Sequence, residues 1–414
     1  MSRDASPEPP ATSVAFGQRV KILRTRRGLT REQFGGLLGK SGSWTRAIEE
    51  GRLKTPGLET VLRMADLLHV RDLSDLTGDQ SVRVALFTGP GHARLAAVKA
   101  SVDALALAPT RAAPPTAHLR ARLDQAWAAR HCAPDHRTVI GDLLPDLIRD
   151  AQLAVRQADT GADRRAAQAL LGEVFALTQF FVAYQPDAPL LWRVADRGMV
   201  AAQDSEDPHA IGVAAWMAAQ AHRERAHFDA ADAVTGEALA FLRPLLPDAA
   251  EGVVAIAGAL TYEAGYTAAR RARTGTAWRY WDQAREIASR LAPGYFHPIT
   301  SFGQAIMGAH AVTIAVELRA GGESVRQASA ADAGTIPSRP RRARHRIEEA
   351  RAYQLDGQPE VALATLEKAH AAAPDTIAYN GYAKTIILEE AESRVSQRRR
   401  RASELAVKVG ILAA

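Results

Sequence analysis

The segment TREQFGGLLGKSGSWTRAIEEG, residues 30–51, predicts two short helices joined by a tight turn. Thr30 is a favourable N-cap for the first helix, and Gly39 is a favourable stop. Ser41 can cap the second helix, which ends at Gly51. Two short helices around a glycine turn form a helix-turn-helix, whose second helix can enter the major groove of DNA.

Three further helices are expected to pack around this pair. Residues 16–27 and 58–69 carry apolar side chains at helical spacing, and residues 72–76 predict a short last helix. We therefore predict a five-helix domain over residues 14–78. The first part of this domain is basic. Residues 16–54 hold ten basic and three acidic side chains, a balance that suits a polyanion as binding partner.

The remaining chain divides into a tail, a connector and a large body. Residues 1–13 lack the hydrophobic stretch of a signal peptide and predict a disordered tail. Residues 79–116 predict a connector with one helix and a Pro-rich hinge, in which VRVALF could be a strand or a helical turn. Residues 117–414 predict about fourteen amphipathic helices, so the whole chain is expected to be all-α.

The helix-turn-helix segment and its neighbours match a known pattern at eleven positions: Gly28, Leu29, Thr30, Glu32, Leu38, Gly39, Ser41, Ser43, Ile48, Glu49 and Gly51. At these positions the chain resembles the Xre/Cro type of helix-turn-helix, which has the lambda-repressor-like fold. The sequence departs from the family at Arg31, where glutamine is usual, at Gly35-Gly36 and at Thr45. Each helical glycine is expected to cost ~1 kcal/mol relative to alanine.

The resemblance implies which side chains meet DNA. It assigns Gly42, Ser43, Trp44 and Arg46 to groove-facing positions and leaves Thr45 for the core. An arginine can contact guanine or a phosphate, and a tryptophan can lie against a thymine methyl group. Packing inside the domain is the alternative for Trp44.

Further basic side chains are expected to contact phosphates rather than bases. Arg31 begins the first helix of the pair, where a helix N-terminus already favours phosphate. Arg24, Arg52 and Lys54 are the other candidates, with solvated charge as the alternative. One such domain reads only about four or five base pairs, so a homodimer on an inverted repeat with half-sites ~34 Å apart is expected.

The body predicts a helical repeat. Seven residues of one helical pair follow the tetratricopeptide pattern: Ala350, Tyr353, Gly357, Ala362, Leu366, Ala369 and Pro374. This part resembles a tetratricopeptide-like α-solenoid with a concave inner surface. In its whole arrangement the chain resembles regulators of high-GC Gram-positive bacteria and, in architecture, the peptide-sensing RRNPP regulators.

The concave surface is the expected effector groove, with core packing as the alternative for each candidate: Trp192, Arg193, Trp216, Tyr262, Tyr266, Trp278, Trp281 and His310. Peptide-binding grooves of this type use asparagines, and the chain has one, Asn380. The effector therefore stays open between a small molecule, a peptide and a protein. A protein adaptor localised by its DNA-binding domain, and an autonomous repressor without effector, are the alternative functions.

Other patterns exclude more than they indicate. The single cysteine, Cys132, rules out an intramolecular disulfide framework, and no apolar run approaches the ~20 residues of a membrane span, so we expect a soluble cytoplasmic protein. His131, Cys132, Asp135 and His136 lack the context of a metal site. No catalytic motif rises above background, so neither an enzyme nor a cofactor is expected.

The basic runs 339–346 and 398–401 are interpreted as solvated helix faces, with contacts to DNA or an acidic partner as the alternative.

Overall fold

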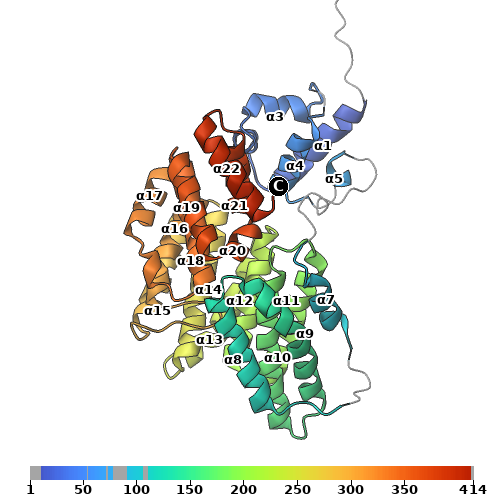
Figure 1. Cartoon of the computed structure of the whole chain (residues 1–414), viewed down its shortest axis with the longest axis vertical. Coiled ribbons are helices and arrows are strands. Elements are labelled where there is room, and N and C mark those ends of the chain that lie inside the picture. The colour runs from blue at the N-terminus through green and yellow to red at the C-terminus, as the bar shows by residue number, and fades with distance from the viewer. Residues whose placement is uncertain (1–10, 54, 71–72, 78–90, 106–110, 412–414) are drawn as a thin grey trace, which may run out of the picture. The chain divides into compact units, whose positions relative to one another are not determined.

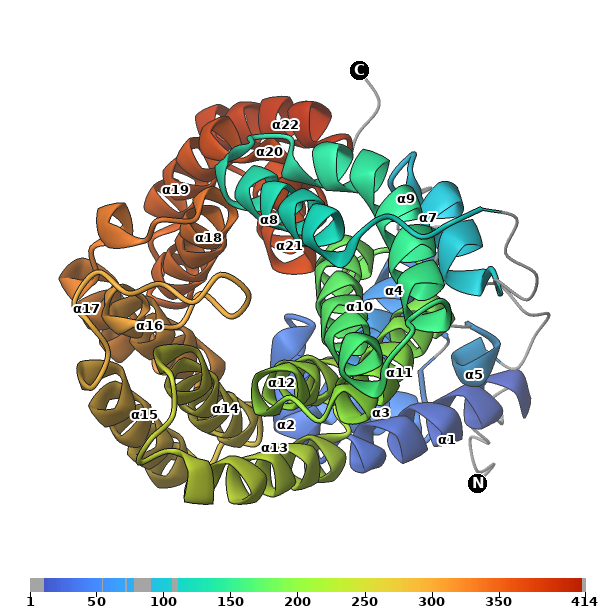
Figure 2. The same ribbon diagram turned by 90° about the horizontal axis from the view of Figure 1, so that it is seen from below.

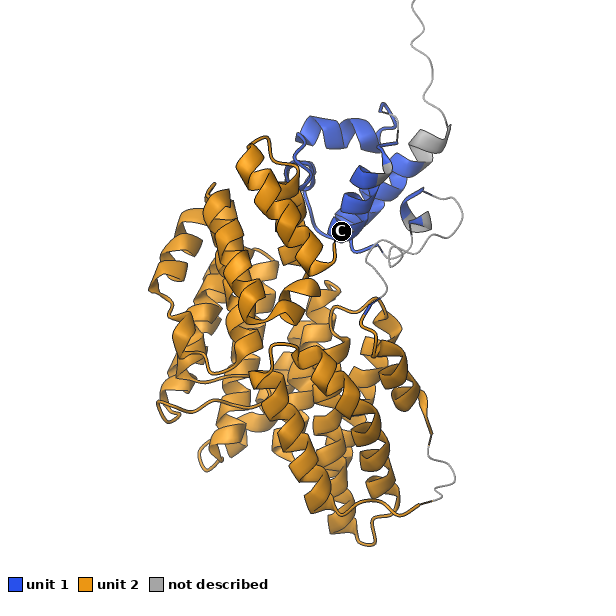
Figure 3. Ribbon diagram, viewed as in Figure 1, with its two compact units in different colours: residues 1–91 blue, residues 92–414 orange. Residues whose placement is uncertain are grey.

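The computed structural model describes residues 11–53, 55–70, 73–77, 91–105 and 111–411. The chain divides into two compact units, residues 1–91 and 92–414 (Figure 3). All regular structure in the described ranges is helical (Figure 1), which confirms the predicted all-α class. No helix in that part of the chain is long and apolar enough to cross a membrane.

The N-terminal unit contains the five expected helices. They are α1 (Ala11–Arg26), α2 (Arg31–Leu37), α3 (Gly42–Glu49), α4 (Leu58–Leu67) and α5 (Ser74–Thr77). Helix α1 begins inside the segment predicted as a disordered tail, whose first ten residues lie outside the described ranges. The helices share one apolar core, whose largest fully buried side chains are Phe16, Phe34 and Met64.

The predicted caps fix the helix-turn-helix. The Thr30 hydroxyl accepts a hydrogen bond from the Gln33 amide at 3.1 Å, and the Gln33 side chain accepts one from the Thr30 amide at 2.8 Å. This reciprocal pair is a capping box. Ser41 accepts from the Trp44 amide at 3.2 Å, and Gly39 in the turn has φ +67°, a conformation that favours glycine.

The C-terminal unit has fifteen described α-helices from residue 116 onward, against about fourteen predicted, and one helix before them. Three short 3₁₀ helices lie at residues 243–245, 304–306 and 333–335. The α-helices are α7 (Leu95–Asp103), α8 (Thr116–Cys132), α9 (His136–Arg156), α10 (Gly161–Val182), α11 (Ala188–Ser205), α12 (Pro208–Glu224), α13 (Phe228–Leu242), α14 (Glu251–Arg270), α15 (Thr274–Ser289), α16 (Met307–Glu317), α17 (Gly321–Ala330), α18 (Arg339–Leu355), α19 (Pro359–Ala372), α20 (Pro374–Ala378), α21 (Gly381–Ala391) and α22 (Ser396–Val409).

These helices form antiparallel hairpins that follow one another around a ring (Figure 2). Helices α10, α12, α14, α16 and α18 each contact the next one and make the inner layer. Helices α13, α15, α17 and α19 pack against them from outside. Small buried side chains are most numerous in α14, where they permit close packing against its neighbours.

The two ends of the ring meet within this unit. Helix α8 contacts α18, and His131 hydrogen-bonds to Ser338 Oγ at 2.9 Å and to the Pro298 carbonyl at 2.7 Å. The Arg137 amide donates to Asp375 at 3.0 Å. The solenoid of residues 92–414 is therefore closed on itself rather than open along one edge.

The helical pair that matches the tetratricopeptide pattern forms the α18–α19 hairpin. Ala350, Ala362 and Leu366 are fully buried between the two helices, and Gly357 makes the turn with φ +75°. The hairpin agrees with a helical repeat, while membership of the tetratricopeptide family stays a prediction.

Part of the predicted connector belongs to the C-terminal unit. The C-terminal unit begins at residue 92, and α7 packs on α9. Within the expected Pro-rich hinge, Arg111 forms an ion pair with Asp150, and the Ala113 amide donates to Gln157 at 2.8 Å. The described part of the hinge is thus attached to α9. The VRVALF segment lies outside the described residues.

Candidate nucleic-acid interface and interior pocket

Helix α3 has a buried side and an exposed side. Thr45, Ile48 and Glu49 are buried, as expected for the first two. Ser43, Arg46 and Glu50 are exposed and recur at a spacing of three or four residues, so they share one face of the helix. The helix is short, but its Ser41 cap and its buried side fix the direction in which this face points.

The buried carboxylate of Glu49 joins three helices. It forms an ion pair with Arg24 of α1 and another with Arg31 of α2, whose Nε lies 2.7 Å from Glu49 Oε2. Arg24 Nη1 also donates to the Leu29 carbonyl at 2.5 Å. The Glu49 side chain is 0% exposed, so both arginines compensate a charge that water cannot reach.

This network corrects the role expected for Arg24. Its side chain is buried and its guanidinium is engaged by Glu49 and Leu29, so it holds the domain together rather than lying free beside a phosphate. Arg31 keeps a side chain that is 33% exposed while its Nε binds Glu49. A phosphate contact from the other face of the Arg31 guanidinium remains compatible with this geometry.

Arg46, predicted to face the groove, and Arg52, predicted to contact a phosphate, lie near the C-terminal end of α3. Arg46 and Arg52 both pair with Glu50 on the surface; Arg46 Nε lies 2.7 Å from Glu50 Oε1. The hydrogen bond from Arg46 lowers the pKa of Glu50. Lys54 lies outside the described residues.

The four predicted groove-facing residues divide into two kinds. Ser43 and Arg46 are exposed, and the Ser43 hydroxyl is 2.7 Å from that of Ser41. Trp44 is partly buried and packs against the core, which was its alternative interpretation. Gly42 lies against α2, where an added Cβ would come within 2.8 Å of Glu32 Oε1.

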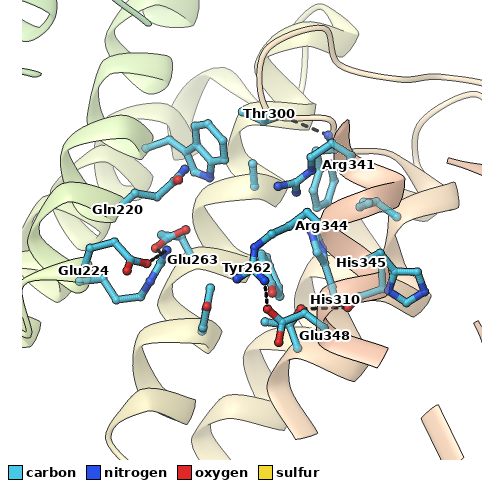
Figure 4. A pocket seen from close by; sticks show the side chains of 18 of the residues that line it. Gln220, Glu224, Tyr262, Glu263, Thr300, His310, Arg341, Arg344, His345 and Glu348 are labelled. Carbon is cyan, nitrogen blue, oxygen red and sulfur yellow. Dashed lines mark hydrogen bonds and ion pairs between the residues drawn. The ribbon is translucent and has the colours of Figure 1, made fainter. Parts of the chain in front are cut away.

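The C-terminal unit encloses a pocket with a volume of about 90 Å³ (Figure 4). Residues of the inner helices α12, α14, α16 and α18 line it, together with Tyr184 from the loop before α11 and with Thr300 and Phe302 from the loop before α16. Four of the eight predicted groove residues lie here: Trp216, Tyr262, Tyr266 and His310.

The other four predicted groove residues lie elsewhere. Trp192 packs against His222 and His227, with ring centroids 4.8 and 6.3 Å away. Arg193 pairs with Asp103 of α7 at 2.5 Å. Trp278 and Trp281 belong to the outer helix α15, so the predicted groove is not one surface. Trp278 lines a separate hollow on α15, and Trp281 donates a hydrogen bond to the Met307 carbonyl at 3.1 Å.

The pocket contains a network of charged side chains that the sequence did not reveal. Residues 339–346 were interpreted as a solvated face, yet Arg341, Arg344 and His345 line the pocket. Arg341, Arg344, His345 and Glu348 are separated by three, one and three residues, which places them on one face of α18. That spacing, with a glutamate in the same stripe, is the signal that could have found them.

Ion pairs account for most of these charges. Arg344 pairs with Glu348, and although burial opposes the charged form, Glu348 raises the pKa of Arg344. Arg223 pairs with Glu263. Burial raises the pKa of Tyr262 to about 12, so its hydroxyl stays neutral at physiological pH.

The remaining sequence features have structural roles. The described residues contain no cluster of three or more His, Cys, Asp or Glu side chains able to hold a metal ion. In the second basic run, Arg398 pairs with Glu360 and Arg401 with Glu367, which ties α22 to α19. Asn380 caps α21 by accepting from the Ala383 amide at 3.0 Å, so the one asparagine of the chain is used in a helix cap.

Comparison with known proteins agrees with the geometry of the N-terminal unit. The model of a family described as a helix-turn-helix domain matches residues 15–76. Searches of curated proteins and of solved structures found no significant match. The N-terminal unit is therefore a helix-turn-helix domain, the fold of DNA-binding regulators.

Proposed function

We propose that this chain is a sequence-specific transcriptional regulator of the Xre type. The exposed face of α3 supports this most directly, because Ser43 and Arg46 project from a helix that a buried ion-pair network holds in place. A fixed helix with exposed hydrogen-bonding side chains is what reading of base edges requires. The proposal assigns the chain to the cytoplasm and gives it no catalytic activity.

On DNA, the arginines at the end of α3 exchange partners. Arg46 leaves Glu50 for guanine O6 and N7 or for a phosphate, and Arg52 turns to the backbone. The released Glu50 carboxylate can accept a hydrogen bond from cytosine N4. Both ion pairs lie at the surface, where water and salt screen them, so breaking them costs little.

A homodimer is the working form in this proposal, because a single α3 covers too few base pairs for specific binding. The tetratricopeptide-like body provides the dimer contact and the effector site. Effector binding would favour one conformation of the body and thereby one separation of the two DNA-binding domains. The use of Asn380 as a helix cap argues against a peptide clamp of the RRNPP kind.

Binding to a genomic operator, measured by fluorescence anisotropy at several salt concentrations, tests the proposal. Each neutralised phosphate is expected to contribute about −0.9 to the slope of log K against log [salt]. A flat line would contradict an electrostatic protein–DNA interface.

Replacing Arg46 with alanine is expected to relax sequence preference by ~1–3 kcal/mol, measured as the affinity ratio between the operator and a site with one changed base pair. Arg26 is an exposed arginine of α1 and provides the control. The Arg26→Ala variant should leave the ratio unchanged. Equal ratios for the wild type and Arg46→Ala would remove Arg46 from base reading.

A further inference from the structure

The interior pocket contains one cation without an anionic partner. Arg341 lines the pocket, and among the described residues no ion pair or hydrogen bond joins its guanidinium to another group. The charged or ionisable groups that act on it most are tyrosines and Arg344, and none is a carboxylate. Burial lowers the pKa of Arg341 from its ordinary value. An arginine nevertheless remains protonated in proteins, so the pocket keeps this positive charge.

The surrounding charges confirm the imbalance. Four glutamates compensate four neighbouring arginines through six ion pairs, and Arg341 belongs to none of them: the pairs are Arg223–Glu224, Arg223–Glu263, Arg270–Glu317, Arg351–Glu317, Arg351–Glu348 and Arg344–Glu348. Burial, together with Arg341, also lowers the pKa of Arg130 to about 9. Arg341 is partly buried, and a partly desolvated cation without a counter-ion is unfavourable, so a bound anion would offset that cost.

Neutral polar groups without partners face the same space. Gln220 Nε2 and both ring nitrogens of His310 are buried and make no hydrogen bond in the described structure. They come from α12 and α16, whereas Arg341 comes from α18, so the three groups converge from different helices (Figure 4). Buried polar groups are usually satisfied, and the Gln220 amide and one ring nitrogen of the neutral His310 can each donate a hydrogen bond to an oxygen atom.

Aromatic rings form the rest of the wall. Tyr262 is stacked on His310 with ring centroids 3.5 Å apart and an interplanar angle of 6°. Trp216 and Phe302 line the pocket as well. Flat aromatic walls around a few polar groups favour a ligand with a planar apolar body.

Tyr184 lies where the pocket meets solvent. Its side chain is 50% exposed although it lines the pocket, and its backbone has φ +66° in the loop between α10 and α11. That conformation is uncommon for a residue other than glycine, asparagine or aspartate. Tyr184 therefore marks the place where the pocket opens to solvent.

We propose that this pocket binds a small aromatic carboxylate, with Arg341 as the counter-ion of the carboxylate and with Gln220 and His310 as further donors. The volume of about 90 Å³ has room for several water molecules, which suits a small molecule and excludes a folded or extended peptide. The role of this ligand as effector rests on the proposed function, whereas its binding rests on the pocket alone.

Isothermal titration calorimetry on the full chain without DNA tests the binding. The probes are benzoate, salicylate, phenylacetate and indole-3-carboxylate, each paired with its neutral amide, and inorganic phosphate. At least one carboxylate is expected to bind, and its amide to bind about tenfold or more weakly, because a charge-assisted hydrogen bond is lost.

Variants identify the counter-ion. Arg341→Gln is expected to weaken carboxylate binding by about 10- to 100-fold. Arg346→Gln is the matched control, since Arg346 lies on the same helix, does not line the pocket and donates only to the Lys368 carbonyl, at 3.4 Å. If Arg341→Gln fails to fold, Arg341→Lys is used instead, because lysine keeps the charge. Arg341→Lys alone should lose less affinity for the carboxylate than the double variant Arg341→Lys with Gln220→Leu.

Several outcomes would overturn the proposal. These are no binding by any carboxylate of the set at millimolar concentration, equal binding of carboxylates and amides, binding of phosphate alone, and equal affinities of the wild type and Arg341→Gln. A chain that binds a carboxylate but no operator would retain the site and refute the proposed regulator. A chain that binds its operator but no carboxylate would retain the proposed regulator and refute the carboxylate site.

Discussion

The Glu49→Gln variant is expected to lose about 3–5 kcal/mol from the free energy of unfolding of the N-terminal unit, because removing one partner of a buried ion pair leaves the other charge uncompensated. The carboxylate is fully buried and binds Arg24 and Arg31 at once. Glutamine keeps the size of the side chain but offers only one oxygen to two cations. Arg24 cannot turn to water, since its own side chain is 10% exposed.

Glu50→Gln is the matched control. It makes the same chemical change one residue later, at a carboxylate whose pairs with Arg46 and Arg52 are exposed. Exposed pairs contribute about 0–1 kcal/mol, so this variant should unfold nearly as the wild type does.

Amide hydrogen exchange of the full chain, resolved by mass spectrometry for residues 31–49, measures both variants. Glu49→Gln should exchange faster throughout this segment, while peptides of the C-terminal unit keep their rates. Equal protection in the two variants would show that the Glu49 network contributes no more than a surface pair. Operator binding should fall with the loss of protection, because α3 is no longer held in place.

The local rules of the sequence predicted the helix-turn-helix well. Caps at Thr30 and Ser41, and a glycine turn at Gly39, depend on neighbouring residues, so a linear reading can find them. The pairing of Arg24 with Glu49 spans 25 positions and three helices. Nothing in the residues next to Arg24 distinguishes it from an arginine that is free to contact a phosphate.

The interior pocket shows the same limit in the body of the chain. A basic run such as residues 339–346 is usually a solvated surface, because an isolated hairpin would expose it. Here α18 is an inner helix, with α16 on one side and α8 on the other. Ring closure removes the solvent from that face, and it follows from contacts between residues that are 207 and 238 positions apart. Helical periodicity cannot encode such distances.

The aromatic side chains divide for a similar reason. Trp216 and Tyr262 lie on inner helices, and Trp278 lies on an outer one, although all three sit in amphipathic segments. Which helix of each hairpin faces inward depends on how the hairpins stack. The repeat phase, inferred from small residues, therefore identified half of the candidate groove residues as pocket residues.

The two glycines of α2 are expected to respond to alanine in opposite directions, although the sequence assigned both the same cost. An added Cβ at Gly35 would lie 2.6 Å from the Ser41 carbonyl oxygen and 2.9 Å from that of Lys40. These are backbone atoms of the turn, which cannot rotate away as a side chain does. Gly35→Ala is therefore expected to destabilise the unit by about 1–3 kcal/mol, the usual range for overpacking.

Gly36→Ala should instead stabilise the unit by about 0.5–1 kcal/mol, the helix preference of alanine over glycine. Gly36 is exposed, and no atom lies within 4 Å of its added Cβ. Amide hydrogen exchange of residues 31–49 shows the sign of each change in stability. Exchange should be slower than in the wild type for Gly36→Ala and faster for Gly35→Ala. Two changes of the same sign would mean that α2 does not approach the turn as closely as the structure shows, and the orientation of α3 would then have another cause.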